Sequence, residues 1–118
     1  FLDAAEGGEW TYEHFERKPE KAMSLYDIAE FGSMVTERLA RWWSATATHP
    51  ALETLATYYG QKSRQDVLER TAWHTAQHTR QLMQLLENAG ISPNEPLTDE
   101  DLAGLPLPTE IYDDQVQL

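Results

Sequence analysis

The chain has 118 residues, with 20 acidic and nine basic side chains, a net charge of −11 and no cysteine. This length is typical of one domain, and the acidic balance excludes a nucleic-acid binder and disfavours docking on an anionic membrane. Without cysteine, a disulfide, a thiolate nucleophile and a cysteine-based zinc site are excluded. Neither a run of 18 apolar residues nor a secretory leader pattern occurs, so the sequence predicts a soluble, cytoplasmic domain.

The first 23 residues carry little periodic pattern. Residues 1–6 read as the last turns of a helix that Gly7-Gly8 stops, and residues 9–23 read as a loop with one turn. Because the chain opens at Phe1, in the middle of an element, we expect it to be part of a longer protein.

A first amphipathic helix is predicted over about 24–46. Ser24 and Asp27 have the spacing of a capping box at its start. His49-Pro50 stops it, because proline disfavours the α conformation in the residue before it. On a helical wheel the apolar residues fall on one side: Leu25, Ile28, Ala29, Val35, Leu39, Trp42 and Trp43.

A second helix is predicted over about 64–89, after a turn at Tyr58-Tyr59-Gly60. Ser63 and Asp66 repeat the capping-box spacing, and Gly90 supplies a C-terminal stop. Its apolar residues fill an arc of about 160°, which is the pattern of a core helix. They are Val67, Leu68, Ala72, Leu82, Met83, Leu85, Leu86 and Ala89.

Residues 91–118 read as an acidic strap, with seven acids, no lysine or arginine and four of the six prolines. Thr98 and Asp101 predict a short helix over about 99–104.

We therefore expect a partial helical-bundle domain at 1–90, followed by the strap. Since no segment alternates with period two, the predicted fold is all-α. Two amphipathic helices do not close a core, so the missing helices are expected from upstream sequence or a partner chain.

One group of side chains on the second helix suggests chemistry. His74 and His78 stand on one helix face about 6 Å apart along the axis, so both imidazoles can reach one divalent ion. They lie at the edge of the apolar arc, where they are expected to face the interior, with the polar Gln81 and Thr75 nearby. Thr75 stands where a zinc peptidase has its glutamate base, which excludes that mechanism. Histidine pairs at this spacing also occur commonly by chance. The alternative is that the two imidazoles donate hydrogen bonds to carbonyls in the core.

At these residues the sequence resembles the last core helix of the DinB/YfiT-like family of metal-dependent enzymes. The strongest element is the His-x-x-x-His-x-x-Gln-Leu run over 74–82. The resemblance extends from Phe1 to about Asp114. It includes Trp42-Trp43, Tyr58-Tyr59-Gly60 and Leu102-Ala103-Gly104-Leu105-Pro106.

The resemblance implies a four-helix bundle, often homodimeric, that here lacks its N-terminal helix or helices. It also implies a divalent metal held by three histidines, with zinc or nickel as the expected ion. His74 and His78 match two of these ligands. The third is expected upstream of Phe1, because neither His14 nor His49 matches its place. Some similar proteins are joined to a glutaredoxin-like domain.

The first functional hypothesis is a metal-dependent S-transferase or isomerase that uses a low-molecular-weight thiol, as members of the family do. His74 and His78 would be the metal ligands, and a small-molecule thiol and an electrophile would be the partners. Gln81 and Thr75 would orient the rings or the ligand. Tyr59 would line the mouth of the pocket, although a core role fits it equally well.

The alternative is a non-catalytic, dimeric helical interaction module with a vestigial metal site. Trp73 lies on the polar side of the second helix, where a large aromatic side chain indicates that another surface covers it. Arg80 would stack beside it in the interface. The acidic strap is a third candidate feature, as a docking segment for a basic partner.

Overall fold

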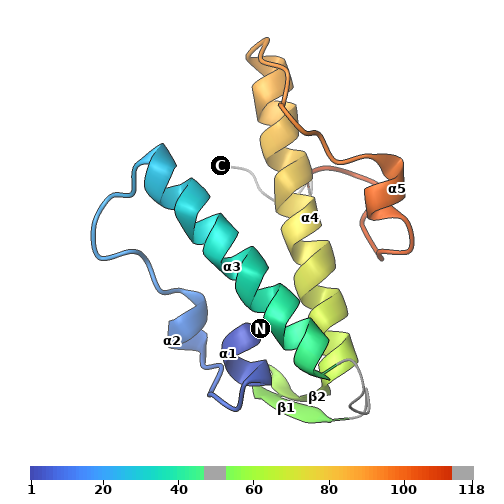
Figure 1. The fold of residues 1–118 in the computed structure, drawn as a ribbon. Coiled ribbons are helices and arrows are strands. Elements are labelled where there is room, and N and C mark those ends of the chain that lie inside the picture. The colour runs from blue at the N-terminus through green and yellow to red at the C-terminus, as the bar shows by residue number, and fades with distance from the viewer. Residues whose placement is uncertain (47–52, 113–118) are drawn as a thin grey trace. The chain divides into compact units, whose positions relative to one another are not determined.

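The structure, a computed structural model, describes residues 1–46 and 53–112. The chain forms two compact units, 1–67 and 68–118, and its longest helix begins in the first and continues into the second (Figure 1). The elements are α1 (Leu2–Ala5), α2 (Tyr12–Phe15), α3 (Leu25–Thr46), β1 (Thr54–Thr57), β2 (Gly60–Ser63), α4 (Arg64–Asn88) and α5 (Asp99–Leu102). None of these helices is both long enough and apolar enough to cross a bilayer.

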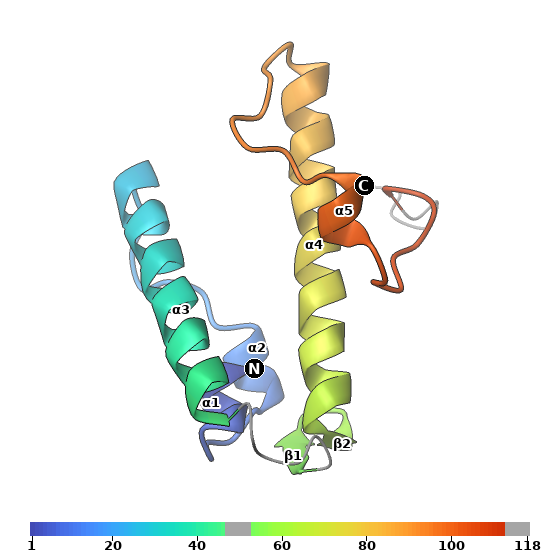
Figure 2. The ribbon, with the colours of Figure 1, turned by 45° about the vertical axis from the view of Figure 1, so that its right-hand side comes forward.

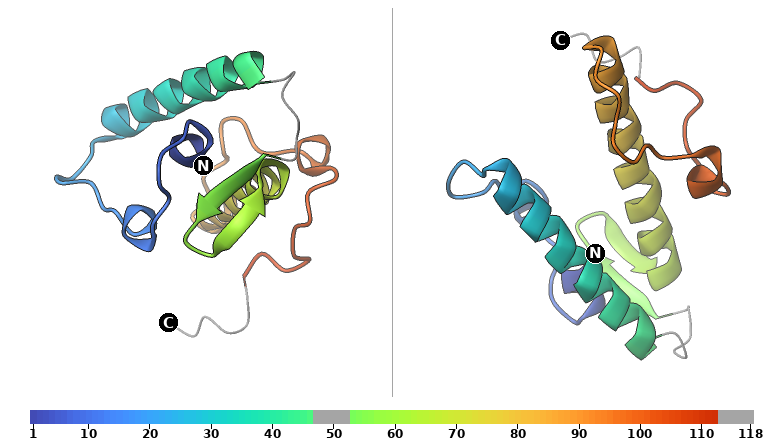
Figure 3. Two further views of the ribbon diagram at one scale, coloured as in Figure 1. Left: turned by 90° about the horizontal axis from the view of Figure 1, so that it is seen from below. Right: turned by 45° about the horizontal axis from the view of Figure 1, so that its top comes forward.

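The prediction of an all-α, four-helix-bundle fold was wrong, because the described chain is a mixed α and β structure. β1 and β2 pair antiparallel, with Thr54 opposite Ser63 and Thr57 opposite Gly60 (Figure 3). Tyr58-Tyr59 forms the two-residue connection of a hairpin, and Gly60 after it has a φ of +109° that favours glycine. Strands of four residues are too short to show a sustained alternation, which explains why the pattern missed them.

The start of α3 agrees with its prediction. The carboxylate of Asp27 accepts a hydrogen bond from the Ser24 backbone N–H at 2.8 Å, and the Ser24 hydroxyl accepts one from the Asp27 N–H at 3.2 Å. The capping box is therefore confirmed. The Ser24 hydroxyl, which donates to the Asp27 carboxylate at 2.7 Å, and the Ser24 backbone N–H lower the pKa of Asp27. The predicted stop at His49-Pro50 lies outside the described residues.

The core of the first unit is small. Its buried apolar side chains come from four elements: Leu2, Ala4, Trp42, Leu55 and Val67. The ring of Phe1 packs edge-on against Trp42, with centroids 5.0 Å apart. Arg64 is buried beside them, where its Nη1 lies 3.0 Å from Glu53 Oε2 and its guanidinium lies 5.9 Å from the Trp42 ring. The carboxylate and the aromatic ring compensate this buried cation.

An ion-pair network ties α1 to α3. Arg38 donates through Nη2 to Asp3 Oδ1 at 2.7 Å and through Nε to Glu6 Oε2 at 3.1 Å. The hydrogen bonds from Arg38 lower the pKa of both carboxyl groups, and the two carboxylates raise the pKa of Arg38. The α1 turn, predicted as the end of a helix, is thus fixed onto α3.

Aromatic rings gather at the hairpin turn. Trp10 pairs with Thr57 through a parallel bridge, and its ring lies 5.8 Å from Tyr58 and 6.0 Å from Tyr59. Tyr12, from the single-turn α2, meets Tyr58 edge-on at 5.7 Å. These contacts fasten the segment before α3 to the hairpin.

The long helix α4 has the predicted ends within one residue. The Ser63 hydroxyl accepts a hydrogen bond from the Asp66 N–H at 3.1 Å at the start. At the other end, the Ile91 N–H bonds the Leu86 carbonyl at 2.9 Å, while Gly90 has a φ of +75°. This is a Schellman stop, which the sequence predicted at Gly90.

After α4 the chain turns back beside that helix (Figure 2). The short helix α5 begins with the predicted capping box, in which Thr98 and Asp101 bond each other reciprocally at 2.8 and 3.3 Å. Residues 108–112 follow and lie against α4 by hydrogen bonds described below. We call 108–112 the docked segment.

Many side chains predicted as core are exposed. On α3 they include Leu25, which is 86 % exposed, with Ile28, Leu39 and Trp43, while Trp42 alone is buried. On α4, Val67 is fully buried, but Leu82, Leu85 and Leu86 are exposed. In the described structure, the apolar face of α3 is therefore buried near its C-terminal end, and that of α4 is buried near its N-terminal end.

Candidate metal centre

The two histidines on α4 are in direct contact. The Nε2 atoms of His74 and His78 lie 3.0 Å apart, and their ring centroids lie 4.7 Å apart with a 50° interplanar angle. Two nitrogens that each bind a tetrahedral ion at about 2.1 Å lie about 3.4 Å from each other. If the two nitrogens moved apart by a few tenths of an ångström, one ion could therefore replace the hydrogen between them.

The surroundings of the pair are more open than predicted. His74 is half-buried and His78 is exposed, and neighbouring Leu82 and Leu85 are exposed as well. The expectation that both rings face an interior is therefore wrong for His78 in the described structure, because the distal part of α4 buries none of its leucines. Burial, with smaller effects from nearby His78 and Arg70, lowers the pKa of His74. The neutral imidazole is thereby favoured, and this is the form that binds a metal.

Gln81 lies three residues after His78 on the same face of α4. Its Oε1 lies 2.9 Å from His78 Nδ1, and its Nε2 donates a hydrogen bond to the Ile111 carbonyl at 3.0 Å. The sequence predicted Gln81 near the pair, and the structure places it in contact with one ring. The second contact, to a residue 30 positions away, had no signal in the sequence.

Gln77 lies on α4 one turn before Gln81. Its side chain is only 8 % exposed. Its Nε2 donates to the carbonyls of Ile111 at 2.6 Å and Glu110 at 3.2 Å. A buried primary amide needs such partners, and the docked segment supplies them.

Arg80 and Tyr112 form further hydrogen bonds between α4 and the docked segment. Arg80 donates through Nη1 to the Pro108 carbonyl at 3.0 Å and to Gln77 Oε1 at 2.8 Å. The Tyr112 hydroxyl donates to the Gln81 carbonyl at 3.0 Å. Gln77, Arg80 and Gln81 share one helix face at spacings of three and four residues, and this set of long donors was the available signal for a docking face.

The remaining predicted residues make other contacts. Thr75 is exposed, and its carbonyl accepts a hydrogen bond from the Thr79 hydroxyl at 2.9 Å. Trp73 is half-buried, with its ring centroid 5.7 Å from that of His74. Tyr59 belongs to the first unit, where it contacts Trp10 in the hairpin cluster.

The pair offers two candidate metal ligands. Residues 1–46 and 53–112 contain no group of three or more His, Cys, Asp or Glu side chains arranged to hold a metal ion. The pair fits part of a metal site, and the third histidine predicted upstream of Phe1 is not in this sequence.

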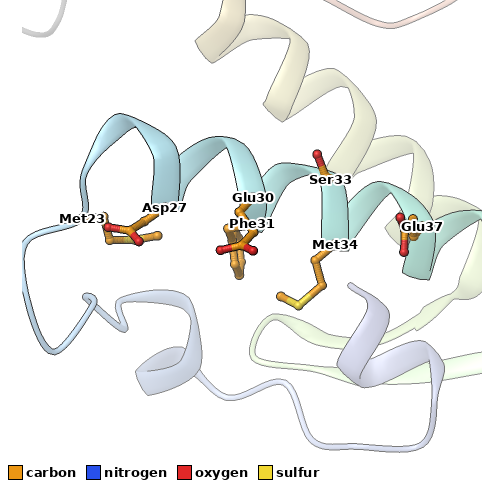
Figure 4. Close-up of a pocket in the computed structure, with 7 residues that line it drawn as sticks. All are labelled: Met23, Asp27, Glu30, Phe31, Ser33, Met34 and Glu37. Atoms are coloured by element: carbon orange, nitrogen blue, oxygen red, sulfur yellow. The ribbon is translucent and has the colours of Figure 1, made fainter.

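An open depression follows one face of α3 (Figure 4). It has a volume of about 530 Å³ and its lining residues all fall between positions 23 and 37, including Phe31, Met34 and Glu30. Its lining combines apolar side chains with carboxylates and carries no histidine. It therefore offers no second candidate for the predicted metal chemistry.

No protein-family model, no curated protein and no solved structure matches this chain. The resemblance to the DinB/YfiT-like family stays a prediction carried by residues 74–82.

Proposed function

We propose that His74 and His78 are two ligands of a divalent metal ion, and that the protein is a metal-dependent S-transferase or isomerase acting with a low-molecular-weight thiol. The observation that carries the metal site is the 3.0 Å separation of the two Nε2 atoms. The lowered pKa of His74 supports it, because a proton then competes less with the ion. The thiol chemistry rests on the resemblance of this helix to the DinB/YfiT-like family.

The metal would be zinc or nickel, which imidazole ligands suit equally. Two protein ligands leave positions for a third histidine, expected upstream of Phe1, and for a substrate. A bound divalent ion supplies positive charge that lowers the pKa of a thiol reaching it. The chain has no cysteine, so the thiol must come from a small molecule.

The residues of the chain have distinct parts in this proposal. His74 and His78 hold the ion through Nε2. Gln81 orients His78 through Nδ1, at 2.9 Å. We place the protein in the cytoplasm, where small thiols are kept reduced.

The test is metal analysis of the purified full-length protein after exposure to Zn²⁺ or Ni²⁺ and removal of excess ion. We expect about one ion per chain in the wild type and a loss of more than tenfold in affinity in His74→Ala. His14→Ala is the matched control, because His14 bonds the Glu9 carbonyl at 3.2 Å in the first unit. An unchanged metal content in His74→Ala would overturn the assignment.

A second candidate is a homodimeric helical interaction module. It is favoured by the exposed apolar side chains of α3, of which Leu25 and Tyr26 are 86 % and 73 % exposed. Arg80, proposed beside Trp73 in that interface, already bonds the docked segment. Sedimentation and quenching of Trp73 fluorescence together test this candidate. A monomeric protein in which Trp73 is freely quenched would rule the candidate out.

A further inference from the structure

We propose that Gln81, held by the docked segment, is a positioning residue that fixes His78 in the tautomer with hydrogen on Nδ1 and the lone pair on Nε2. The residues at positions 108–112 would then control how well His78 binds a metal. The consequence for metal affinity rests on the proposed function. The tautomer itself does not.

The orientation of the Gln81 amide follows from its partner in the docked segment. The Ile111 carbonyl can only accept a hydrogen bond, so the group that faces it at 3.0 Å must be the amide nitrogen. The amide oxygen then faces His78 Nδ1 at 2.9 Å. Because this oxygen can only accept, Nδ1 must carry the hydrogen.

With hydrogen on Nδ1, the lone pair of His78 lies on Nε2. A neutral imidazole carries one hydrogen, so Nε2 of His78 is left as an acceptor. It faces Nε2 of His74 at 3.0 Å, and this contact makes the His74 nitrogen the donor. An arriving ion would meet a His78 ring that needs no change of tautomer.

The Ile111 carbonyl is itself held in place by contacts that do not involve the Gln81 side chain. Gln77 donates to it at 2.6 Å from a nearly buried side chain. Arg80 binds the Pro108 carbonyl at 3.0 Å, and the Tyr112 hydroxyl reaches the Gln81 backbone at 3.0 Å. The Ile111 carbonyl is therefore a fixed hydrogen-bond acceptor. It sets the orientation of the Gln81 amide, and this amide sets the tautomer of His78. Outer partners of this kind typically change metal affinity by about 10- to 100-fold.

The experiment compares the full-length wild type with Gln81→Leu, which keeps the size of the side chain and removes both amide contacts. The first readout is the tautomer of His78 in the metal-free protein, from long-range ¹H–¹⁵N correlation spectra at about pH 8.5, where histidine is neutral. The second is the Zn²⁺ dissociation constant from competition with a chromophoric chelator. Gln84→Leu is the matched control, because Gln84 lies on the same helix and bonds Asn88 at 3.1 Å.

We expect hydrogen on Nδ1 of His78 in the wild type and in Gln84→Leu, and a mixture of tautomers in Gln81→Leu with Zn²⁺ affinity about tenfold weaker. Gln77→Leu, which leaves both His78 and Gln81 in place, should move the tautomer in the same direction. Hydrogen on Nε2 in the wild type, or the same tautomer in Gln81→Leu, would overturn the inference. A wild type that shows the expected tautomer but binds no Zn²⁺ supports the positioning role and overturns the proposed function instead.

Discussion

Gln81 and Ile111 lie 30 residues apart in the chain and are joined by a 3.0 Å hydrogen bond from the side-chain amide to the backbone carbonyl. This bond links the proline-rich tail to the helix that carries both histidines. A tail of this composition is usually solvated or packed over a bundle end. Here the carbonyls of residues 108–111 accept hydrogen bonds from α4 side chains, so this part of the tail lies against the helix that carries the candidate site.

Arg80→Leu should loosen the docked segment. Loss of the hydrogen bonds from this half-buried guanidinium to Pro108 and Gln77 should cost the docked state about 1–2 kcal/mol, which raises the undocked fraction about tenfold. The ¹H–¹⁵N heteronuclear NOE of residues 109–112 should fall accordingly. Gln84→Leu should leave it at the wild-type value. The same NOE in Arg80→Leu and wild type would show that the segment is held by other contacts.

Val67→Ala should lower the free energy of unfolding by about 2–3 kcal/mol, since Val67 has no exposed surface and its truncation leaves a cavity. Urea unfolding followed by circular dichroism measures this loss. Leu85→Ala is the comparison, because Leu85 is 57 % exposed and its loss should stay below about 1 kcal/mol. Equal losses at the two positions would mean that another surface covers Leu85.

Arg38→Met should destabilise the protein at neutral pH and not at acidic pH. Hydrogen bonds from Arg38 lower the pKa of Asp3 and Glu6, so their contribution is present above the unfolded pKa values of about 3.9 and 4.3. It is lost as the pH falls through the lower folded values, because both carboxylates become protonated. The urea midpoints of wild type and variant should differ at pH 7 and converge near pH 2. A constant difference over this range would indicate lost packing of the Arg38 stem instead.

Local signals predicted the helix boundaries well. Ser24 with Asp27 and Thr98 with Asp101 are contacts over three residues, so their capping boxes can be read directly from spacing. Gly90 is similar, because a positive φ at a helix end selects glycine. These features depend on neighbours in the chain alone.

Features that depend on distant residues were missed or misread. The hairpin is made of two four-residue strands, and a pattern of that length does not stand out beside helices of 22 and 25 residues. The burial of Gln77 had no signal in the sequence, because its partners, Glu110 and Ile111, lie more than 30 residues away. The histidine pair was found by its spacing, whereas its exposure depends on how much of α4 is covered.

We propose that His74 and His78 together bind one divalent ion. The most direct measurement is a Zn²⁺ titration of the full-length protein, monitored through the imidazole ¹⁵N signals of each histidine. We predict that the Nε2 signals of His74 and His78 shift together and saturate at one ion per chain, while those of His14 stay unchanged. A titration in which only one of the two rings responds, or in which neither responds, would contradict the claim.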